Sequence, residues 1–263
     1  MLNKLLKYDL KGIYKSLVIF YSIGIFFAIL TRVFFLVDNS TVINVIAQIC
    51  SGVTISMIFN IIINNLLRSW PLFKSSLYGD ASYLTHTLPV KKSTLYISKV
   101  LTALITLFTS VAVITLLLFT AYYSKDNMQI LKGILLPLAT TFDTNITGIL
   151  VVTLFVLFLE LAVALQGGFT GIILGHRMNS GKTGFSVLFG FLAYMLNQIL
   201  GIIILFIISA FDSSIKDMFL TNSIPGIDAI KTILLFATII YTILFIIGFF
   251  VNIKLLKKGV NVD

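Results

Sequence analysis

The strongest constraint on this chain is a series of six apolar runs, each close to the ~20 residues that an α-helix needs to cross a bilayer. They lie at about 17–37, 43–67, 100–123, 148–174, 185–210 and 230–253. Hydrophobic residues make up 58% of the 263, and charged residues only 11%, against roughly 25% in a soluble domain. No soluble core could bury that much apolar surface. The sequence therefore predicts an all-α integral membrane protein with six transmembrane helices in a single domain, 1–263.

The distribution of basic residues predicts the orientation of the spans, because inner loops of membrane proteins are rich in Lys and Arg. With the N-terminus inside, the inner segments hold most of the 19 basic residues. The inner set is Lys4, Lys7, Lys11, Lys15, Arg68, Lys74, Lys91, Lys92, Lys99, Arg177, Lys182, Lys254, Lys257 and Lys258. The outer set is Arg32, Lys125, Lys132, Lys216 and Lys231. Both termini are thus predicted in the cytoplasm, and the net charge of +9 reflects topology rather than nucleic-acid binding.

The first 16 residues have the pattern of an amphipathic helix. Four lysines spaced three or four residues apart share one helical face. Leucines and Ile13 occupy most of the other face, where Asp9 is the exception. The pattern predicts an interfacial helix over 1–16 that lies on the inner membrane surface, with its lysines toward anionic headgroups.

The longest polar interruption, residues 70–99, is predicted to face the cytoplasm as a folded element. Leu72–Tyr83 has the pattern of a short amphipathic helix broken by Gly79. A second helix is expected to start after Pro89, with Ser93 or Thr94 as its N-cap.

This segment resembles the cytoplasmic loop between the second and third membrane helices of ABC-2-type permeases, the membrane subunits of ATP-driven exporters. Relatives carry G-D-x-x-Y-L-T-x-T-L-P-V, then a basic pair, then S-K. The matching residues are Gly79, Asp80, Tyr83, Leu84, Thr85, Thr87, Leu88, Pro89, Val90, Lys91, Lys92, Ser98 and Lys99. Many relatives have Glu-Gly in place of Ala81-Ser82, so an acidic contact at that point is not carried over.

The resemblance implies that the 70–99 loop forms a coupling helix that docks on a separate ATPase subunit. The residues expected to make that contact are Tyr78, Gly79, Asp80, Tyr83, Leu84, Thr85, Leu88 and Pro89. It also implies a homodimer of permeases with two ATPase subunits that bind ATP and Mg, so that this chain is expected to hold no cofactor. The expected cargo is amphipathic or hydrophobic, such as a peptide, exported across a bacterial plasma membrane. For the 70–99 loop, the alternative to a coupling helix is an interfacial loop that only joins two spans.

Glu160 is the only acid expected deep within a span, where a charge costs roughly 2.5–3.5 kcal/mol or more. Gly167, Gly171 and Gly175 follow it on the same face, and such small residues allow close helix packing. Glu160 is therefore predicted to lie near a packing face, either as a polar bridge to another span or in contact with cargo.

Weakly polar stripes occur in the second and fifth spans. One comprises Gly52, Ser56, Asn60 and Asn64, and the other Gly190, Ala193, Asn197 and Gly201, with Gln198 beside it. Such stripes suit either buried helix contacts or the wall of a pathway. The family resemblance favours the wall of a pathway. The candidates for this translocation path are therefore Asn60, Asn64, Asn197 and Gln198, together with Glu160.

Neither a catalytic set nor a metal site is expected. Ser180-Gly181-Lys182-Thr183 lacks the earlier glycine and the preceding strand of a phosphate loop, and is predicted to be a turn. Cys50 is the only cysteine, which excludes a disulfide framework. The alternatives to an exporter subunit are an ATP-independent channel or secondary transporter and, with less support, an intramembrane enzyme.

Two long outer segments, 124–147 and 212–229, each carry the pattern of a short helix at the outer surface. Non-helical backbone cannot face lipid, so these segments must lie outside the bilayer or pack on protein.

Overall fold

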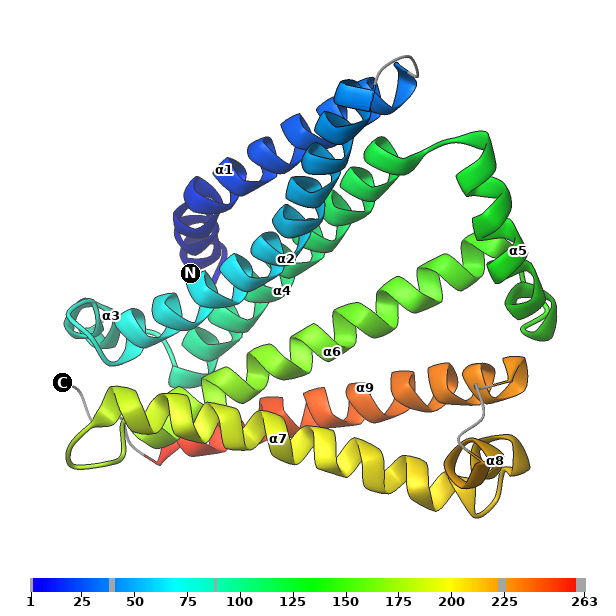
Figure 1. Cartoon of the computed structure of the whole chain (residues 1–263). Coiled ribbons are helices and arrows are strands. Elements are labelled where there is room, and N and C mark those ends of the chain that lie inside the picture. Colours follow the sequence, from blue (N-terminus) through cyan, green and yellow to red (C-terminus); the bar gives the residue numbers. More distant parts are fainter. Residues whose placement is uncertain (1, 38–40, 88, 222–225, 259–263) are drawn as a thin grey trace. The chain divides into compact units, whose positions relative to one another are not determined.

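The structure is a computed structural model that describes residues 2–37, 41–87, 89–221 and 226–258 (Figure 1). Over these ranges the chain is helical and forms no strand. The helices are α1 (Leu2–Leu36), α2 (Thr41–Leu77), α3 (Ser82–Thr87), α4 (Lys92–Tyr122), α5 (Lys125–Thr141), α6 (Ile146–Gly175), α7 (Lys182–Ser209), α8 (Ser213–Thr221) and α9 (Ile227–Lys257). Within the described part, α1, α2, α4, α6, α7 and α9 are long and apolar enough to cross a membrane. These six helices confirm the all-α class and the predicted number of spans.

Two of the long helices extend further than the sequence predicted. α1 is one helix from Leu2 to Leu36, so the predicted amphipathic segment and the first span are continuous, and the first turns of the ribbon run in a different direction from the rest (Figure 1). No proline or turn sequence separates the basic segment from the apolar run, so the helix continues. α2 passes through Pro71 and ends only at Leu77. The proline removes one backbone hydrogen bond of the helix, and the helix continues beyond it.

The described helices group into two compact units. Unit 1 spans Met1–Met128 and contains α1 to α4, and unit 2 spans Gln129–Asp263 and contains α6 to α9. The division falls within α5.

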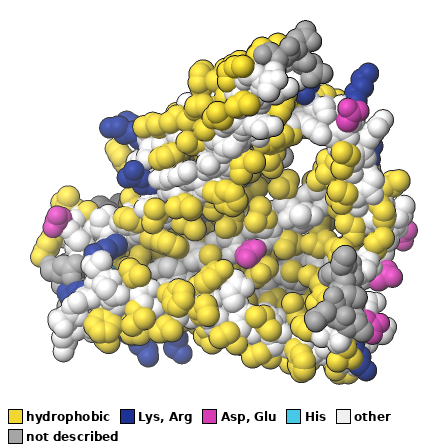
Figure 2. Space-filling view, viewed as in Figure 1, with side chains coloured by type: hydrophobic (Ala, Val, Ile, Leu, Met, Phe, Trp, Pro, Cys, Tyr) yellow, Lys and Arg dark blue, Asp and Glu magenta, His cyan; other side chains and the backbone are white. Residues whose placement is uncertain are grey.

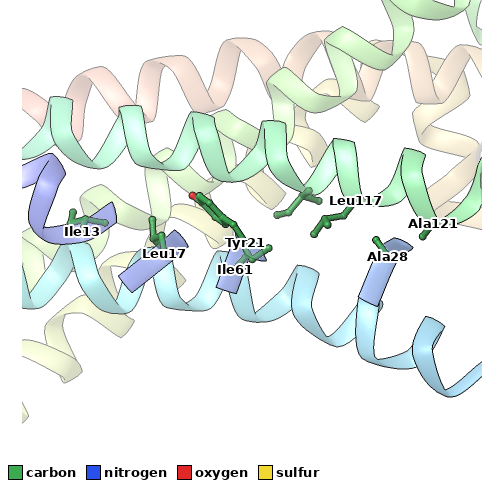
Figure 3. Packing of buried hydrophobic residues seen from close by; sticks show 8 residues of the cluster. Ile13, Leu17, Tyr21, Ala28, Ile61, Leu117 and Ala121 are labelled. Carbon is green, nitrogen blue, oxygen red and sulfur yellow. The ribbon is translucent and has the colours of Figure 1, made fainter. Parts of the chain in front are cut away.

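The core of unit 1 is a seam along which α1 packs between α2 and α4 (Figure 3). Ile13, Leu17, Tyr21 and Ala28 recur along one face of α1, at the three- and four-residue spacing that places side chains on one face of a helix. They meet Ile61 of α2 and Ile114, Leu117 and Ala121 of α4. Half of the most apolar stretch of α4 is buried inside the chain, a larger share than in α1 or α2.

Polar side chains link the same three helices. The Tyr21 hydroxyl lies 2.8 Å from Ser110 Oγ, which also accepts a 2.9 Å hydrogen bond from Asn65 Nδ2. Ser110 donates its own hydrogen to the carbonyl of Thr106. Buried polar groups are stable only when they are bonded in this way. Asn65 therefore serves helix packing in unit 1.

Unit 2 contains the close helix packing that the glycine spacing predicted. On α6, a Cβ added at Gly171 would contact the backbone of Gly190, and would lie 2.5 Å from the Ser186 carbonyl oxygen of α7. A Cβ at Gly175 would likewise overlap Ser186. α6 and α7 therefore touch backbone to backbone, which only glycine permits.

A buried polar cluster joins α6 to α9. Asn252 Nδ2 donates to Gln166 Oε1 at 2.9 Å, and Thr170 Oγ1 donates to Asn252 Oδ1 at 2.8 Å. Gln166 and Asn252 are almost completely buried. These three side chains fix the register of the two helices.

The two long outer segments form helices α5 and α8, as predicted. Asp212 precedes α8, and its carboxylate accepts hydrogen bonds from the backbone N–H groups of Ser214 and Ile215 and from the Thr232 hydroxyl. Desolvation raises the pKa of Asp212, but these hydrogen bonds outweigh it and hold the pKa below its usual value. Asp212 thus joins the start of α8 to α9.

The flanks of the long helices are apolar. None of the most apolar stretch of α7 is buried inside the chain, and little of that of α9. Figure 2 shows hydrophobic side chains over most of the visible surface, with Lys and Arg toward the helix ends. This is the distribution of a multi-pass membrane protein, whose flanks contact lipid.

Replacing Gly171 by Ala is expected to destabilise unit 2 by about 1–3 kcal/mol, because α6 and α7 must separate to admit the methyl group. Gly201→Ala on α7 is the control, since nothing lies within 4 Å of its added Cβ. Thermal unfolding of both variants in one detergent measures the difference. Equal stability would contradict the backbone contact.

Candidate functional site

The candidate site is the α3 end of unit 1. Of the predicted loop 70–99, residues 70–77 belong to α2 and residues 92–99 to α4, so only 78–91 lie between these long helices. The amphipathic helix expected over Leu72–Tyr83 is not a separate element, because residues 72–77 continue α2. The break expected at Gly79 is confirmed: α2 ends at Leu77, and α3 begins at Ser82.

The end of α2 is defined by its last hydrogen bonds. The N–H groups of Tyr78 and Gly79 both donate to the Lys74 carbonyl, at 2.8 and 3.2 Å. A Cβ on Gly79 would approach Ser75 Cα to 3.2 Å, so glycine suits this tight turn. Ser82 N–H then donates to the Gly79 carbonyl at 2.8 Å and starts α3.

α3 carries two large apolar side chains on its surface. Tyr83 is 66% exposed and Leu84 is 76% exposed. Thr85 and Thr87 direct their hydroxyls to carbonyls of the same segment, at 2.9 Å each. Among the described side chains none covers Tyr83 and Leu84, which leaves both largely exposed.

A buried aromatic platform supports this turn. Phe73 of α2 and Tyr96 of α4 pack edge to face, with ring centroids 6.0 Å apart, and both are fully buried. Tyr78 is only 1% exposed. It was expected to contact an ATPase, but it lies in the interior of unit 1 and supports the turn from behind.

The remaining predicted contact residues divide as follows. Asp80 and Pro89 are exposed, Gly79 and Thr85 are half-buried, and Leu88 lies outside the described residues. Lys91 takes the N-cap position of α4 with no side-chain cap bond. The expected cap at Ser93 or Thr94 is therefore wrong, because the cap lies two or three residues earlier.

A buried ion pair joins α1 to α4 at the same end of α4. Lys99 Nζ lies 2.7 and 2.8 Å from the two carboxylate oxygens of Asp9, and the Ser98 hydroxyl is 3.5 Å from one of them. Both partners are buried. Asp9 thus belongs on the apolar face of α1 because its charge is paired there, and the pair ties the N-terminal helix to α4 just after the α3 turn.

The polar stripe of α2 takes no part in the packing of unit 1. Ser56 donates to the Gly52 carbonyl, Asn60 to Ser56 and Asn64 to Asn60, each at 2.9 Å. Gly52 has open space at its Cβ position, and Asn60 and Asn64 remain partly exposed. The side chains satisfy one hydrogen bond each on their own helix and keep the rest of their polar groups accessible.

Glu160 of α6 is partly buried. It interacts electrostatically with Tyr241 of α9, and Tyr241 also interacts electrostatically with Tyr194 of α7. Among the described residues Glu160 forms no ion pair. Asn197 and Gln198 are partly buried on α7. These three path candidates lie in unit 2 and Asn60 and Asn64 lie in unit 1.

Sequence reasoning missed the pairing of Asp9 with Lys99 and the Gln166–Thr170–Asn252 cluster. Asp9 stood out as a charge on an apolar face, but its partner is 90 residues away and was counted with the inner cations. Gln166 and Asn252 were signals of the same kind, polar residues inside apolar runs.

The other candidate chemistries find no support in the described ranges. No group of three His, Cys, Asp or Glu side chains there could hold a metal ion. Ser180-Gly181-Lys182-Thr183 forms the predicted turn and the start of α7, with helix α6 before it rather than a strand. Gly181 adopts a left-handed φ of 64°.

Comparison with family models, curated proteins and solved structures gives no match to the chain.

Removing one partner of the Asp9–Lys99 pair is expected to cost about 3–5 kcal/mol, because the other charge remains buried alone. Asp9→Asn and Lys99→Met should each show this loss in thermal unfolding, and the double variant should recover most of it. Lys11→Met, which alters an exposed lysine of the same helix, is the control. Additive losses in the double variant would contradict the pairing.

Proposed function

We propose that this chain is the membrane-spanning permease subunit of an ATP-binding cassette exporter, and that α3 is its coupling element. The observation that carries the proposal is the exposure of Tyr83 and Leu84 on a short helix whose base is buried. Apolar side chains in a rigid, water-exposed position are typical anchors of protein interfaces. The resemblance of 79–99 to the ABC-2-type loop supports the same role.

The proposed topology places both termini and α3 in the cytoplasm of a bacterial cell, with the six long helices in its plasma membrane. The basic residues around α3 support this orientation. They are Arg68, Lys74, Lys91 and Lys92. An ATPase is a soluble cytoplasmic protein, so a coupling element must lie on this side.

The partner ATPase would supply ATP and Mg binding, and two copies of it would act on two copies of this chain. Movement of an ATPase groove that holds Tyr83 and Leu84 would be passed to α2 and α4 through the Phe73–Tyr96 contact. The Asp9–Lys99 pair would carry the movement to α1. A braced turn transmits displacement because packed helices move as rigid bodies.

The proposed cargo is amphipathic or hydrophobic, such as a peptide. Few charges lie within the six predicted spans, which suits such a cargo better than an ion or a sugar. The path candidates remain Asn60, Asn64, Glu160, Asn197 and Gln198, whose polar groups are partly exposed in the single chain.

A second candidate function is ATP-independent transport. The observation that favours it is Glu160, an acid without an ion-pair partner in the described structure that interacts electrostatically with Tyr241. Intramembrane acids of this kind serve proton or ion relays in secondary transporters.

The Tyr83→Ala/Leu84→Ala variant is expected to lose an ATPase that co-purifies with the tagged parent chain from its native host, because the two anchors are removed. Retention should fall at least about tenfold, as for interface anchors worth more than 1.4 kcal/mol. Affinity purification in mild detergent, followed by protein identification and an ATPase assay, measures this.

Phe211→Ala/Leu220→Ala provides the matched control. It removes an equally exposed aromatic and aliphatic pair, 89% and 71% exposed, from the outer segment between α7 and α9. This control should retain the ATPase. A folded parent chain that never retains an ATPase would overturn the exporter proposal and favour ATP-independent transport.

A further inference from the structure

A cavity of about 580 Å³ opens at the end of unit 1 formed by the C-terminal ends of α1 and α4. Its lining combines cations, apolar side chains and hydrogen-bonding groups. The lining residues are Arg32, Phe35, Leu36, Ala121, Tyr122, Ser124, Lys125 and Asn127. The α3 turn lies at the other end of α4, so this cavity is separate from the site described above.

The cavity has two cations without a carboxylate partner. Arg32 and Lys125 form no ion pair within the described ranges of the chain. The Arg32 guanidinium is 5.9 Å from the centroid of the Tyr123 ring, which holds it in a cation–π contact at the rim. An arginine fork and a lysine point charge together suit a phosphate group.

Neutral groups of the lining add hydrogen-bonding capacity. Asn127 N–H donates to Ser124 Oγ at 3.0 Å, which leaves the Ser124 hydroxyl hydrogen free to turn toward a ligand. Asn127 Nδ2 donates to the Tyr122 carbonyl at 2.8 Å. The Tyr122 hydroxyl is 2.7 Å from Ser51 Oγ of α2, which fixes the aromatic wall.

The position of the cavity along the helices indicates an amphiphilic ligand. The apolar run of α4 ends at Tyr122 and Tyr123, and aromatic residues of this kind mark the border between hydrocarbon and headgroups. Phe35 and Leu36 are 46% and 67% exposed and continue the apolar wall of α1 beside the cations. A ligand with a phosphate and acyl chains satisfies both halves of this lining.

We propose that this cavity binds the phosphate headgroup of an anionic phospholipid, with Arg32 and Lys125 as the phosphate ligands and Phe35 and Leu36 against the first part of the acyl chains. A guanidinium and an ammonium group bind a phosphate through charge-assisted hydrogen bonds. The site is independent of the coupling proposed for α3. A lipid bound in this cavity holds the C-terminal ends of α1 and α4 together.

Native mass spectrometry of the full chain in mild detergent tests this, with phosphatidylglycerol and phosphatidylcholine titrated in parallel. Phosphatidylglycerol is expected to bind at least about tenfold more tightly than phosphatidylcholine, and Arg32→Gln/Lys125→Gln should remove that preference. Lys132→Gln/Lys216→Gln, which removes two exposed lysines elsewhere, should preserve it. Thermal unfolding confirms that each variant is folded.

Two further arms keep the test decisive. Lys125→Gln alone alters an exposed side chain, so it should weaken phosphatidylglycerol binding without affecting packing, even where Arg32→Gln prevents folding. Glycerol phosphate, the soluble headgroup, should fail to displace the lipid at equal concentration. Unchanged phosphatidylglycerol preference in the double variant, or in Lys125→Gln, would overturn the proposal, and so would equal binding of glycerol phosphate, which would assign a site for free phosphate.

Discussion

A hydrocarbon environment offers no hydrogen-bonding partner, and the arrangement of this chain follows from that constraint. Each long segment satisfies its backbone as a helix, and the polar side chains within these helices are largely bonded nearby. Asn60 and Asn64 donate to their own helix, whereas Asn65 and Asn252 bond to neighbouring helices. Where helices approach most closely, at Gly171, the side chain is absent. Polar bonds and glycine contacts thus replace the hydrophobic driving force that lipid cannot supply between helices.

The α3 end of unit 1 does not follow this pattern of bonded and packed side chains. Tyr83 and Leu84 are exposed, whereas the groups behind them are buried: Phe73, Tyr78 and Tyr96. The Asp9–Lys99 pair adds α1 to the same support at the cost of burying two charges. A loop that only joined two spans would need neither the platform nor exposed anchors, which is the physical reason for assigning α3 a partner.

The helices were predictable because their apolar runs are long and match the thickness of a bilayer. The spacing of Gly167, Gly171 and Gly175 indicated a close-packing face on α6, but not that α7 would pack against it. Boundaries were not predictable to the same degree. α2 continues through Pro71, although an interior proline removes one hydrogen bond of the helix. α1 is continuous through residue 16, where its sequence has no proline. Tyr78 and Tyr83 were predicted together as contact residues, but Tyr78 is buried and Tyr83 is exposed. The Asp9–Lys99 pair required knowledge of which distant helices touch, which a single sequence does not contain.

The proposed role of α3 requires that it lie in the cytoplasm, since α3 can couple to an ATPase only from that side. Cysteine labelling measures it directly. In a Cys50→Ala background, single cysteines at Tyr83 and Phe211 provide reporters at two exposed positions. With a membrane-impermeant thiol reagent, the account predicts labelling of Phe211→Cys in intact cells, and labelling of Tyr83→Cys only after the membrane is permeabilised. Labelling of Tyr83→Cys in intact cells would place α3 outside and contradict the account.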